Sequence, residues 1–391
     1  MERERSGRDD RSRPPLERGA GNGDDGSGRS RRSVLETVGA AGAAVGLSGV
    51  AGCLGGAVGG SETITVDYHP YYSEAFSALV IRHGELWEKH LPDGYDVEWH
   101  AVLQGAPTVN RLISGQTDLG YMGDNPAIIA AANDDTPIRI VGLSGYSMGQ
   151  QGNLCVVHED ADLESAADLD GREVNVTQGT LSHRFLLTVL EQEDIDVTIR
   201  DQDINTIVTN LREGSIDVAF GWEPSMARVV DQASSGRYLF TGADYDEPDL
   251  GALVMPDSLI EDRPEVAKGW LKAELEAKHL LATEPDRALD LGMEESELSR
   301  DLERETVRTT LYENLEVNPE VDRQRFYTDF SAVGPARDLL TDTGPEFLLE
   351  EAEVIDRTPP SDRYDTDLLS EAADDLESEV DWNPRRAGDR S

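Results

Sequence analysis

The sequence contains very little lysine and few basic side chains altogether. Four of its 391 residues are lysines, and 35 Lys and Arg residues stand against 78 Asp and Glu residues, for a formal net charge of −43. Because the acidic residues recur between apolar positions along the whole chain, we expect a solvated, self-repelling surface suited to high ionic strength, as in halophilic proteins. This charge argues against nucleic acid as a partner.

Cysteine and two common catalytic motifs are also scarce or absent. The two cysteines, Cys53 and Cys155, lie in contexts too different for a disulfide framework or a metal site with paired ligands. The sequence has no HExxH motif and no phosphate-binding loop, and we expect no nucleophile elbow. We therefore expect no catalytic residue, no metal site and no cofactor.

The N-terminal region contains signals for export and anchoring. Residues 1–29 have almost no apolar side chains, so we expect a disordered extension there. Residues 30–52 contain the pair Arg31-Arg32 and a weakly apolar stretch rich in Gly and Ala, which predicts a twin-arginine signal. This stretch is too short and too rich in glycine for a membrane span.

The export signal ends in Val50-Ala51-Gly52-Cys53, which resembles the lipobox of exported lipoproteins. Cys53 is expected to be lipidated as the first residue of the mature protein, and the alternative is a buried or incidental cysteine. Residues 53–62 are expected to form a flexible tether. The rest of the protein would then lie outside the cell, anchored to the outer face of the membrane.

From residue 63 onward, short β-branched runs alternate with amphipathic helical patterns, which is typical of α/β folds with mainly parallel sheets covered by helices. The chain is long enough for two such units, with lobe one expected from residues 63–145 and 250–345 and lobe two from 146–249. Residues 346–391 are expected to form an acidic C-terminal tail. Strands are expected at 63–68, 95–102, 118–122, 138–144, 154–157, 173–177, 216–220 and 251–255.

A repeated pattern locates a cleft between the two lobes. Residues 112–121 and 211–220 share the spacing L-x-x-G-x-x-D followed by apolar, small and aromatic residues. An acid and a proline follow each copy, in Gly123-Asp124-Asn125-Pro126 and in Gly221-Trp222-Glu223-Pro224. Since ligands bind in α/β sheets at strand carboxyl ends and helix starts, Asp124, Asn125, Trp222 and Glu223 are candidate ligand contacts. Packing turns with acidic caps are the alternative.

Three further loops are also expected between the carboxyl end of a strand and the start of a helix. Each combines Gly or Pro with hydrogen-bonding side chains at an expected helix start, which suits capture of a small anionic or zwitterionic group by backbone N–H donors. Simple helix capping is the alternative for the hydroxyl residues. The candidate ligand contacts in these loops are Tyr68, His69, Tyr71, Gln104, Gly105, Thr180, Ser182 and His183.

These motifs resemble the nitrate, sulfonate and taurine branch of periplasmic-type solute-binding proteins, which also includes pyrimidine-precursor binders. The resemblance runs from about residue 63 to 340 and is carried by residues 105–107, 114–121, 179–183 and 219–224. It implies a two-lobed type II periplasmic-binding-protein fold with a ligand cleft between the lobes, and hinge closure about crossovers near 145–152 and 244–251. It also implies a monomer that delivers a small solute to the permease subunits, and through them the ATPase, of an ABC importer.

The sequence predicts the identity of the ligand less directly than it predicts the fold. If Asp124 and Glu223 both face the cleft, they favour a solute with an amine, and an aminosulfonate is the first hypothesis. The aromatic side chains Tyr68, Tyr71, Tyr72 and Trp222 could equally stack on a heterocycle. The competing functions are an enzyme of the pyrimidine-precursor type, with His69 or His183 as a base, and a ligand-sensing receptor.

Overall fold

The computed structural model describes residues 62–147, 152–295 and 337–385. The expected disordered extension, the export signal and the lipidation site at Cys53 lie outside these residues. Among the helices that the structure does describe, none combines the length and apolar character needed to span a membrane.

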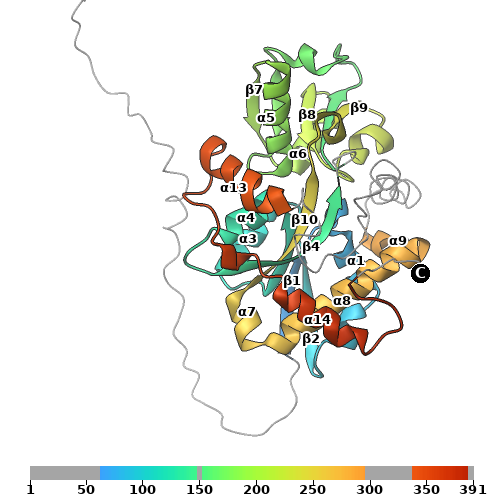
Figure 1. The fold of residues 1–391 in the computed structure, drawn as a ribbon. Coiled ribbons are helices and arrows are strands. Elements are labelled where there is room, and N and C mark those ends of the chain that lie inside the picture. Colours follow the sequence, from blue (N-terminus) through green and yellow to red (C-terminus); the bar gives the residue numbers. More distant parts are fainter. Residues whose placement is uncertain (1–61, 148–151, 296–336, 386–391) are drawn as a thin grey trace, which may run out of the picture. The chain divides into compact units, whose positions relative to one another are not determined.

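The strands form two five-stranded sheets, with the orders β2-β1-β3-β10-β4 and β7-β6-β8-β5-β9 (Figure 1). The strands are β1 (Glu62–Tyr68), β2 (Tyr95–Ala101), β3 (Leu119–Gly123), β4 (Ile138–Ser147), β5 (Leu154–His158), β6 (Glu173–Val176), β7 (Thr198–Asp201), β8 (Val218–Gly221), β9 (Gly236–Thr241) and β10 (Asp249–Pro256).

Each sheet has four strands in one direction and one reversed strand. In the first sheet, β1 pairs in parallel with β2 and β3, and β10 is antiparallel to β3 and β4. In the second, β6 pairs in parallel with β7 and β8, and β5 is antiparallel to β8 and β9. The mainly parallel α/β fold expected from the sequence is confirmed, and the expected return strand at 251–255 is the reversed strand β10.

Helices follow most of the parallel strands, as the sequence pattern predicts. The α-helices of the described residues are α1 (Phe76–His83), α2 (Leu86–His90), α3 (Gly105–Ile113), α4 (Asp124–Ala131), α5 (Leu181–Glu193), α6 (Ile204–Arg212), α7 (Asp257–Asp262), α8 (Pro264–Thr283), α9 (Pro285–Gly292), α13 (Gly344–Glu346) and α14 (Asp367–Glu377). The buried faces of α3 and α6 carry apolar residues at the i, i+3, i+4 spacing of an amphipathic helix.

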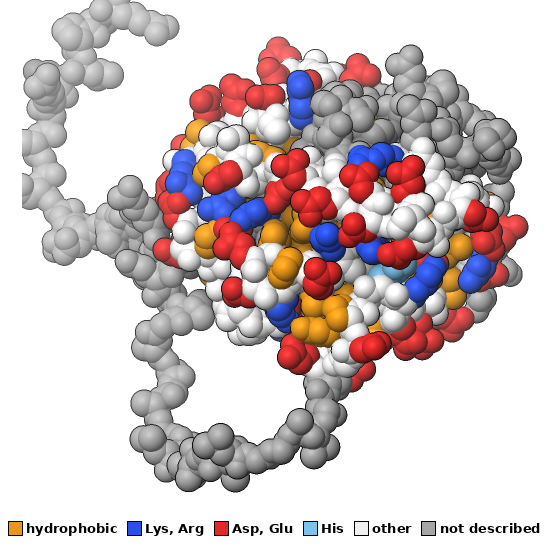
Figure 2. Space-filling view, turned by 60° about the horizontal axis from the view of Figure 1, so that its bottom comes forward, with side chains coloured by type: hydrophobic (Ala, Val, Ile, Leu, Met, Phe, Trp, Pro, Cys, Tyr) orange, Lys and Arg blue, Asp and Glu red, His pale blue; other side chains and the backbone are white. Residues whose placement is uncertain are grey.

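Acidic side chains cover the surface broadly. Figure 2 shows Asp and Glu spread over the visible face, with fewer Lys and Arg between them. Large apolar side chains are mostly buried in the part of the chain that the structure describes, and Val354 is the exception, at 46% exposure.

The C-terminal segment, expected as a tail, packs against lobe one as far as it is described. Helix α14 lies against α8 (Figure 1), and Leu369 and Leu376 on it are fully buried in the core that also contains Trp270. Ahead of α14, the Tyr364 hydroxyl donates a hydrogen bond of 2.7 Å to the carbonyl of Leu340. The acidic side chains of this segment therefore belong to its outer surface, and its apolar side chains pack against lobe one.

Removing this hydrogen bond should lower stability. We expect Tyr364→Phe to reduce the free energy of unfolding by about 1 kcal/mol, because the carbonyl of the buried Leu340 then lacks this partner. Tyr245→Phe is the matched control, since its hydroxyl bonds Glu193 at 2.8 Å in an exposed position. Urea unfolding at fixed salt gives both values, and equal losses would contradict the packing described here.

Candidate ligand-binding site

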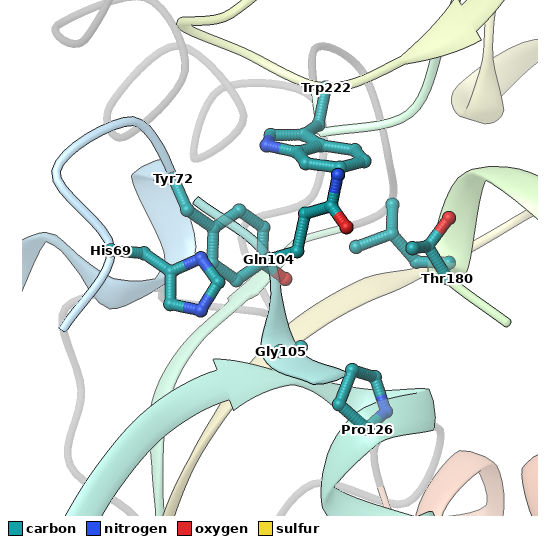
Figure 3. A pocket seen from close by; sticks show the side chains of 9 residues that line it. His69, Tyr72, Gln104, Gly105, Pro126, Thr180 and Trp222 are labelled. Carbon is teal, nitrogen blue, oxygen red and sulfur yellow. The ribbon is translucent and has the colours of Figure 1, made fainter. Parts of the chain in front are cut away.

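Three helices begin at a single pocket that lies between the two sheets. Its space of about 300 Å³ is partly open to solvent. The lining comes from the starts of α3, α4 and α5, from the loop after β1 and from the end of β8. The nine lining residues are His69, Tyr72, Gln104, Gly105, Gly123, Pro126, Thr180, Leu181 and Trp222. Figure 3 shows the Gln104 side chain reaching toward the Trp222 ring, with His69 and Tyr72 to one side and Thr180 to the other.

The three helix starts lack side-chain caps. Gln104, Gly123 and Thr180 are the N-cap residues of α3, α4 and α5, and no cap bond from any of these side chains is found in the described structure. The Thr180 hydroxyl instead donates to the Thr177 carbonyl at 2.6 Å. Backbone N–H groups of a first helical turn have no partner inside the helix, and they carry the positive end of the helix dipole. The pocket therefore collects three N-terminal helix ends that favour an anion. In α4, the Asn125 N–H already bonds the Asp124 carboxylate at 2.6 Å, so that helix offers fewer N–H donors than α3 and α5.

Glycine at position 105 allows α3 and α4 to begin this close together. A Cβ on Gly105 would lie 2.4 Å from both Cβ and Cγ of Pro126. Pro126 is the third residue of α4, where the missing N–H costs no helical hydrogen bond. Both residues therefore suit a place where two helix starts meet.

His69 supplies a buried polar group to the same pocket. It is 4% exposed, and its Nε2 has no hydrogen-bond partner among the described residues. Burial lowers the pKa of His69 to about 4, so the ring is neutral at neutral pH. A neutral imidazole offers one N–H donor and one acceptor, and an unpartnered buried nitrogen is a group that a ligand can satisfy.

Hydrogen bonds join the two lobes on both sides of the pocket. On one side, the Trp222 indole donates to the Tyr71 carbonyl at 3.1 Å. On the other, the Asn125 side-chain amide donates to the Thr180 carbonyl at 3.0 Å. The lobes thus approach each other directly around the candidate ligand position.

The two carboxylates on which the amine hypothesis depended do not line this pocket. Asp124 is fully buried and accepts a hydrogen bond of 2.5 Å from Arg184. Glu223 is also fully buried, and it accepts hydrogen bonds from the Ala227 N–H at 2.8 Å and from the Tyr238 hydroxyl at 2.5 Å. The condition that both acids face the cleft is therefore not met, and with it the electrostatic case for an amine falls.

Five other candidates also lie outside the pocket lining, and one of them is the fully buried Asn125. The Tyr68 ring packs edge-on against Trp99, with its hydroxyl bonded to Arg82 and Glu295. Tyr71 contributes its carbonyl to Trp222 rather than its ring to the pocket. Ser182 is fully buried, with its hydroxyl unpartnered within the described ranges, and His183 packs edge-on against Phe347.

Tyr72, which the sequence suggested only as one of several aromatic side chains for stacking on a heterocycle, also belongs to the pocket. Its ring lines the pocket, and its hydroxyl lies 2.6 Å from Asp249 Oδ1 and 2.8 Å from the Leu250 carbonyl, at the start of β10. Burial, followed by the nearby acids Asp249, Glu74 and Asp124, raises the pKa of Tyr72 well above its ordinary value. Tyr72 therefore remains protonated and links the pocket wall to the strand that returns from lobe two.

A second and larger cavity adjoins this pocket. Its space of about 790 Å³, also partly open to solvent, shares Gln104, Gly105, Pro126 and Thr180 with the first pocket. The remaining lining includes the apolar side chains Ala106, Val109, Ile129 and Val354. The two cavities together offer an anion-favouring end and a partly apolar end.

One serine motif calls for comment. Residues 145–149 have the G-x-S-x-G spacing of a nucleophile elbow, so the expectation that the sequence contains no such spacing is wrong. An elbow places its serine between a strand and a helix. Ser147 instead ends β4, and the next element that the structure describes is β5. Residues 148–151 lie outside the described part of the chain, and within that part no helix follows the serine before β5.

Comparison with known proteins assigns the family. Residues 93–288 match the model of the family described as NMT1/THI5 like. The chain belongs to this family. A taurine-binding periplasmic protein of Escherichia coli is 25% identical over 236 residues, which cover 59% of this chain and 71% of that protein. A putative aliphatic sulfonates-binding protein of the same organism is 27% identical over 185 residues, which cover 45% of this chain and 55% of that protein.

Solved structures agree on the fold. The periplasmic aliphatic sulphonate-binding protein of Escherichia coli superposes with a TM-score of 0.60 at 19% identity, covering 79% of this chain and 99% of that one. The periplasmic nitrate-binding protein of Synechocystis PCC 6803 gives 0.60 at 15% identity, covering 83% and 92%. The desulfurization enzyme DSZB gives 0.57 at 14% identity, covering 82% and 100%. The two-lobed binding-protein fold is thus confirmed, and it is shared by binding proteins and an enzyme.

Proposed function

We propose that the protein is the extracytoplasmic solute-binding subunit of an ABC importer and that it captures a small oxoanion of the sulfonate type. The observation that carries the proposal is the meeting of three uncapped helix starts at one pocket. Nine lining residues without a carboxylate, and a neutral His69 with a free nitrogen, suit an oxoanion held by hydrogen bonds rather than by a cation. The names of the two Escherichia coli relatives support the same class.

The adjoining cavity favours an organic sulfonate over an inorganic anion. The oxoanion group would bind at the starts of α3, α4 and α5, and an organic substituent would extend past Gln104 and Thr180 into the larger cavity. Ala106, Val109 and Ile129 suit an apolar substituent, since burial of apolar surface drives binding there. An alkanesulfonate accordingly replaces the aminosulfonate as the preferred ligand.

The transport cycle follows from the two-lobed fold. Ligand that binds the closed arrangement more tightly than the open one shifts the lobes toward closure, and the permease would recognise that closed form. Lipidation of Cys53 would keep the protein near its permease at the outer face of the membrane. The expected tether, 53–62, would give it the necessary reach.

A thermal-shift screen tests the proposed function. The full chain in molar salt is titrated with alkanesulfonates of increasing length, taurine, nitrate and simple carboxylates. A ligand at a hundred times its dissociation constant adds about 2.7 kcal/mol of stability, a shift that is readily measured. We expect the largest shift with an alkanesulfonate, and no shift from any anion in a folded protein would contradict the proposal.

Two variants connect the screen to the pocket. Trp222→Ala should weaken binding about tenfold, because it removes an aromatic wall and the indole bond to Tyr71. Glu223→Gln, one residue further, is the matched control and should keep its affinity, since that carboxylate is held by Tyr238 and Ala227. Equal losses in both variants would mean that the ligand binds elsewhere.

A further inference from the structure

A buried arginine occupies an unusual place beside the pocket. Arg184 is the fourth residue of α5, within the first turn, where a positive charge is opposed by the helix dipole. It is also only 6% exposed. Both conditions are costly for a cation, so its position requires specific partners.

The partners of Arg184 come from both lobes and from the connection between them. One terminal nitrogen, Nη1, donates to Asp124 at 2.5 Å and to Asn125 at 3.2 Å, both on α4 of lobe one. Nη2 donates to the Pro248 carbonyl at 3.0 Å, and Nε to the Glu247 carboxylate. Burial works against the charge of Arg184, but the Asp124 and Glu247 carboxylates outweigh it and raise its pKa, so the guanidinium stays charged.

Asp124 is the reason that this charge matters for the pocket. It follows the lining residue Gly123 and begins α4, where its carboxylate accepts a hydrogen bond of 2.6 Å from the Asn125 N–H. Without a cation beside it, this carboxylate would repel a bound anion. Burial raises the pKa of Asp124, and the charge and hydrogen bond of Arg184 oppose that rise and keep the carboxylate paired.

Asn125 adds a structural connection. Because a guanidinium has only donors, Asn125 presents its carbonyl oxygen to Arg184 and directs its amide nitrogen to the Thr180 carbonyl. Thr180 is the N-cap of α5, so the start of one pocket helix is bonded to the start of another across the lobes. Arg184 thereby fixes the relative position of two of the three helix ends.

We propose that Arg184 is a positioning residue for anion capture, which neutralises Asp124 beside the pocket and, through Asn125, ties the start of α4 to the start of α5. This inference rests on the proposed function. Glu247 on the connecting segment also faces this group, and it accepts a further bond from Thr188 at 3.0 Å. The nearby titratable groups on the pocket's other side are Tyr72, Glu74 and Asp249.

The test is a charge-balance cycle read as a pH profile. Wild type, Arg184→Met, Asp124→Asn and the double variant are titrated by calorimetry with the alkanesulfonate that binds wild type best, from pH 6 to 9. Wild type should vary little over this range. Arg184→Met should bind about tenfold more weakly at pH 9 than at pH 6, because Asp124 then ionises without a partner. The double variant should lose that pH dependence and recover most of the affinity.

Several results would overturn the inference. One is a flat pH profile for folded Arg184→Met, and another is a double variant as weak as the single one at pH 9. If Arg184→Met does not fold, the double variant, which leaves no unpaired Asp124 charge, should fold and bind, and a folded double variant that fails to bind also refutes the role. Arg200→Met is the control, since Arg200 pairs with Glu173 on the lobe-two surface at 2.7 Å and should leave binding unchanged. Failure of wild type to bind any sulfonate would refute the proposed function instead.

Discussion

Gly105→Ala is expected to weaken ligand binding by about a hundredfold or more. The new methyl group would lie 2.4 Å from two carbons of the Pro126 ring, a distance at which one helix start must move. Pro126 is a rigid residue within α4, so the strain cannot be relieved by a rotamer change. Because α3 and α4 both present their first turns to the pocket, a displacement of about 1 Å removes the convergence of donors on which an anion depends.

The measurement is calorimetric titration of the folded variant with the preferred sulfonate. Thermal unfolding should show a loss of about 1–3 kcal/mol from overpacking, small enough to leave the protein folded. Gly142→Ala is the matched control, because a Cβ there meets Leu369 at an ordinary contact distance of 3.6 Å. The double variant Gly105→Ala with Pro126→Gly makes room for the methyl group and should restore part of the affinity. Wild-type affinity in folded Gly105→Ala would show that these helix starts do not hold the ligand.

Much of the architecture was predictable from the sequence because the two lobes repeat one structural unit. Each copy of the L-x-x-G-x-x-D pattern ends a helix with glycine and leads into a buried strand, β3 in one lobe and β8 in the other. The strands that the sequence did not predict are β7 and β9, at edges of the second sheet. β7 has four residues and no fully buried side chain, and every residue of β9 is half-buried. Neither strand is therefore buried enough to show the hydrophobic pattern from which a strand is predicted.

The site was predictable in position but not in side-chain direction. The structure brings His69, Gln104, Gly105, Thr180 and Trp222 together in one pocket, as expected from strand ends and helix starts. The sequence could have excluded Tyr68 from the candidate ligand contacts. Ile64, Val66 and Tyr68 alternate along β1 and share its core-facing side.

The directions of the Asp124 and Glu223 side chains could not be predicted from the neighbouring residues in the sequence. Each is held by a partner outside its own motif, Arg184 for the first and Tyr238 for the second. Arg184 is sixty positions from Asp124 and belongs to the other lobe. The direction of a carboxylate at a helix start depends on such partners, so the charge of the pocket follows only from the folded structure.

Glu223→Gln is expected to stabilise the protein at pH 7 to 8 by about 2 kcal/mol relative to its effect at pH 5. Burial raises the pKa of Glu223 to about 7 from an ordinary value of 4.5, against the opposing hydrogen bonds from Tyr238 and Ala227. The folded state therefore holds the Glu223 proton more tightly than the unfolded state does. The stability linked to this proton is fully present below about pH 4.5 and is lost as the pH rises through about 7. The full difference between a pKa of 4.5 and one of about 7 corresponds to about 3 kcal/mol, and about 2 kcal/mol of it is lost between pH 5 and pH 7 to 8.

Glutamine removes this titration while keeping both contacts, because its carbonyl oxygen can accept from Ala227 and its amide can donate to the Tyr238 oxygen. Urea unfolding of both proteins at pH 5, 6, 7 and 8, without ligand and at fixed salt, gives the difference in free energy at each pH. His69, whose pKa burial lowers to about 4, contributes in the opposite sense, with stability lost as the pH falls from about 6.5 through 4. It is present in both proteins and cancels from the difference. A difference that stays constant from pH 5 to 8 would mean that Glu223 is already ionised throughout, so that Tyr238 and Ala227 stabilise its charge more strongly than its burial opposes it.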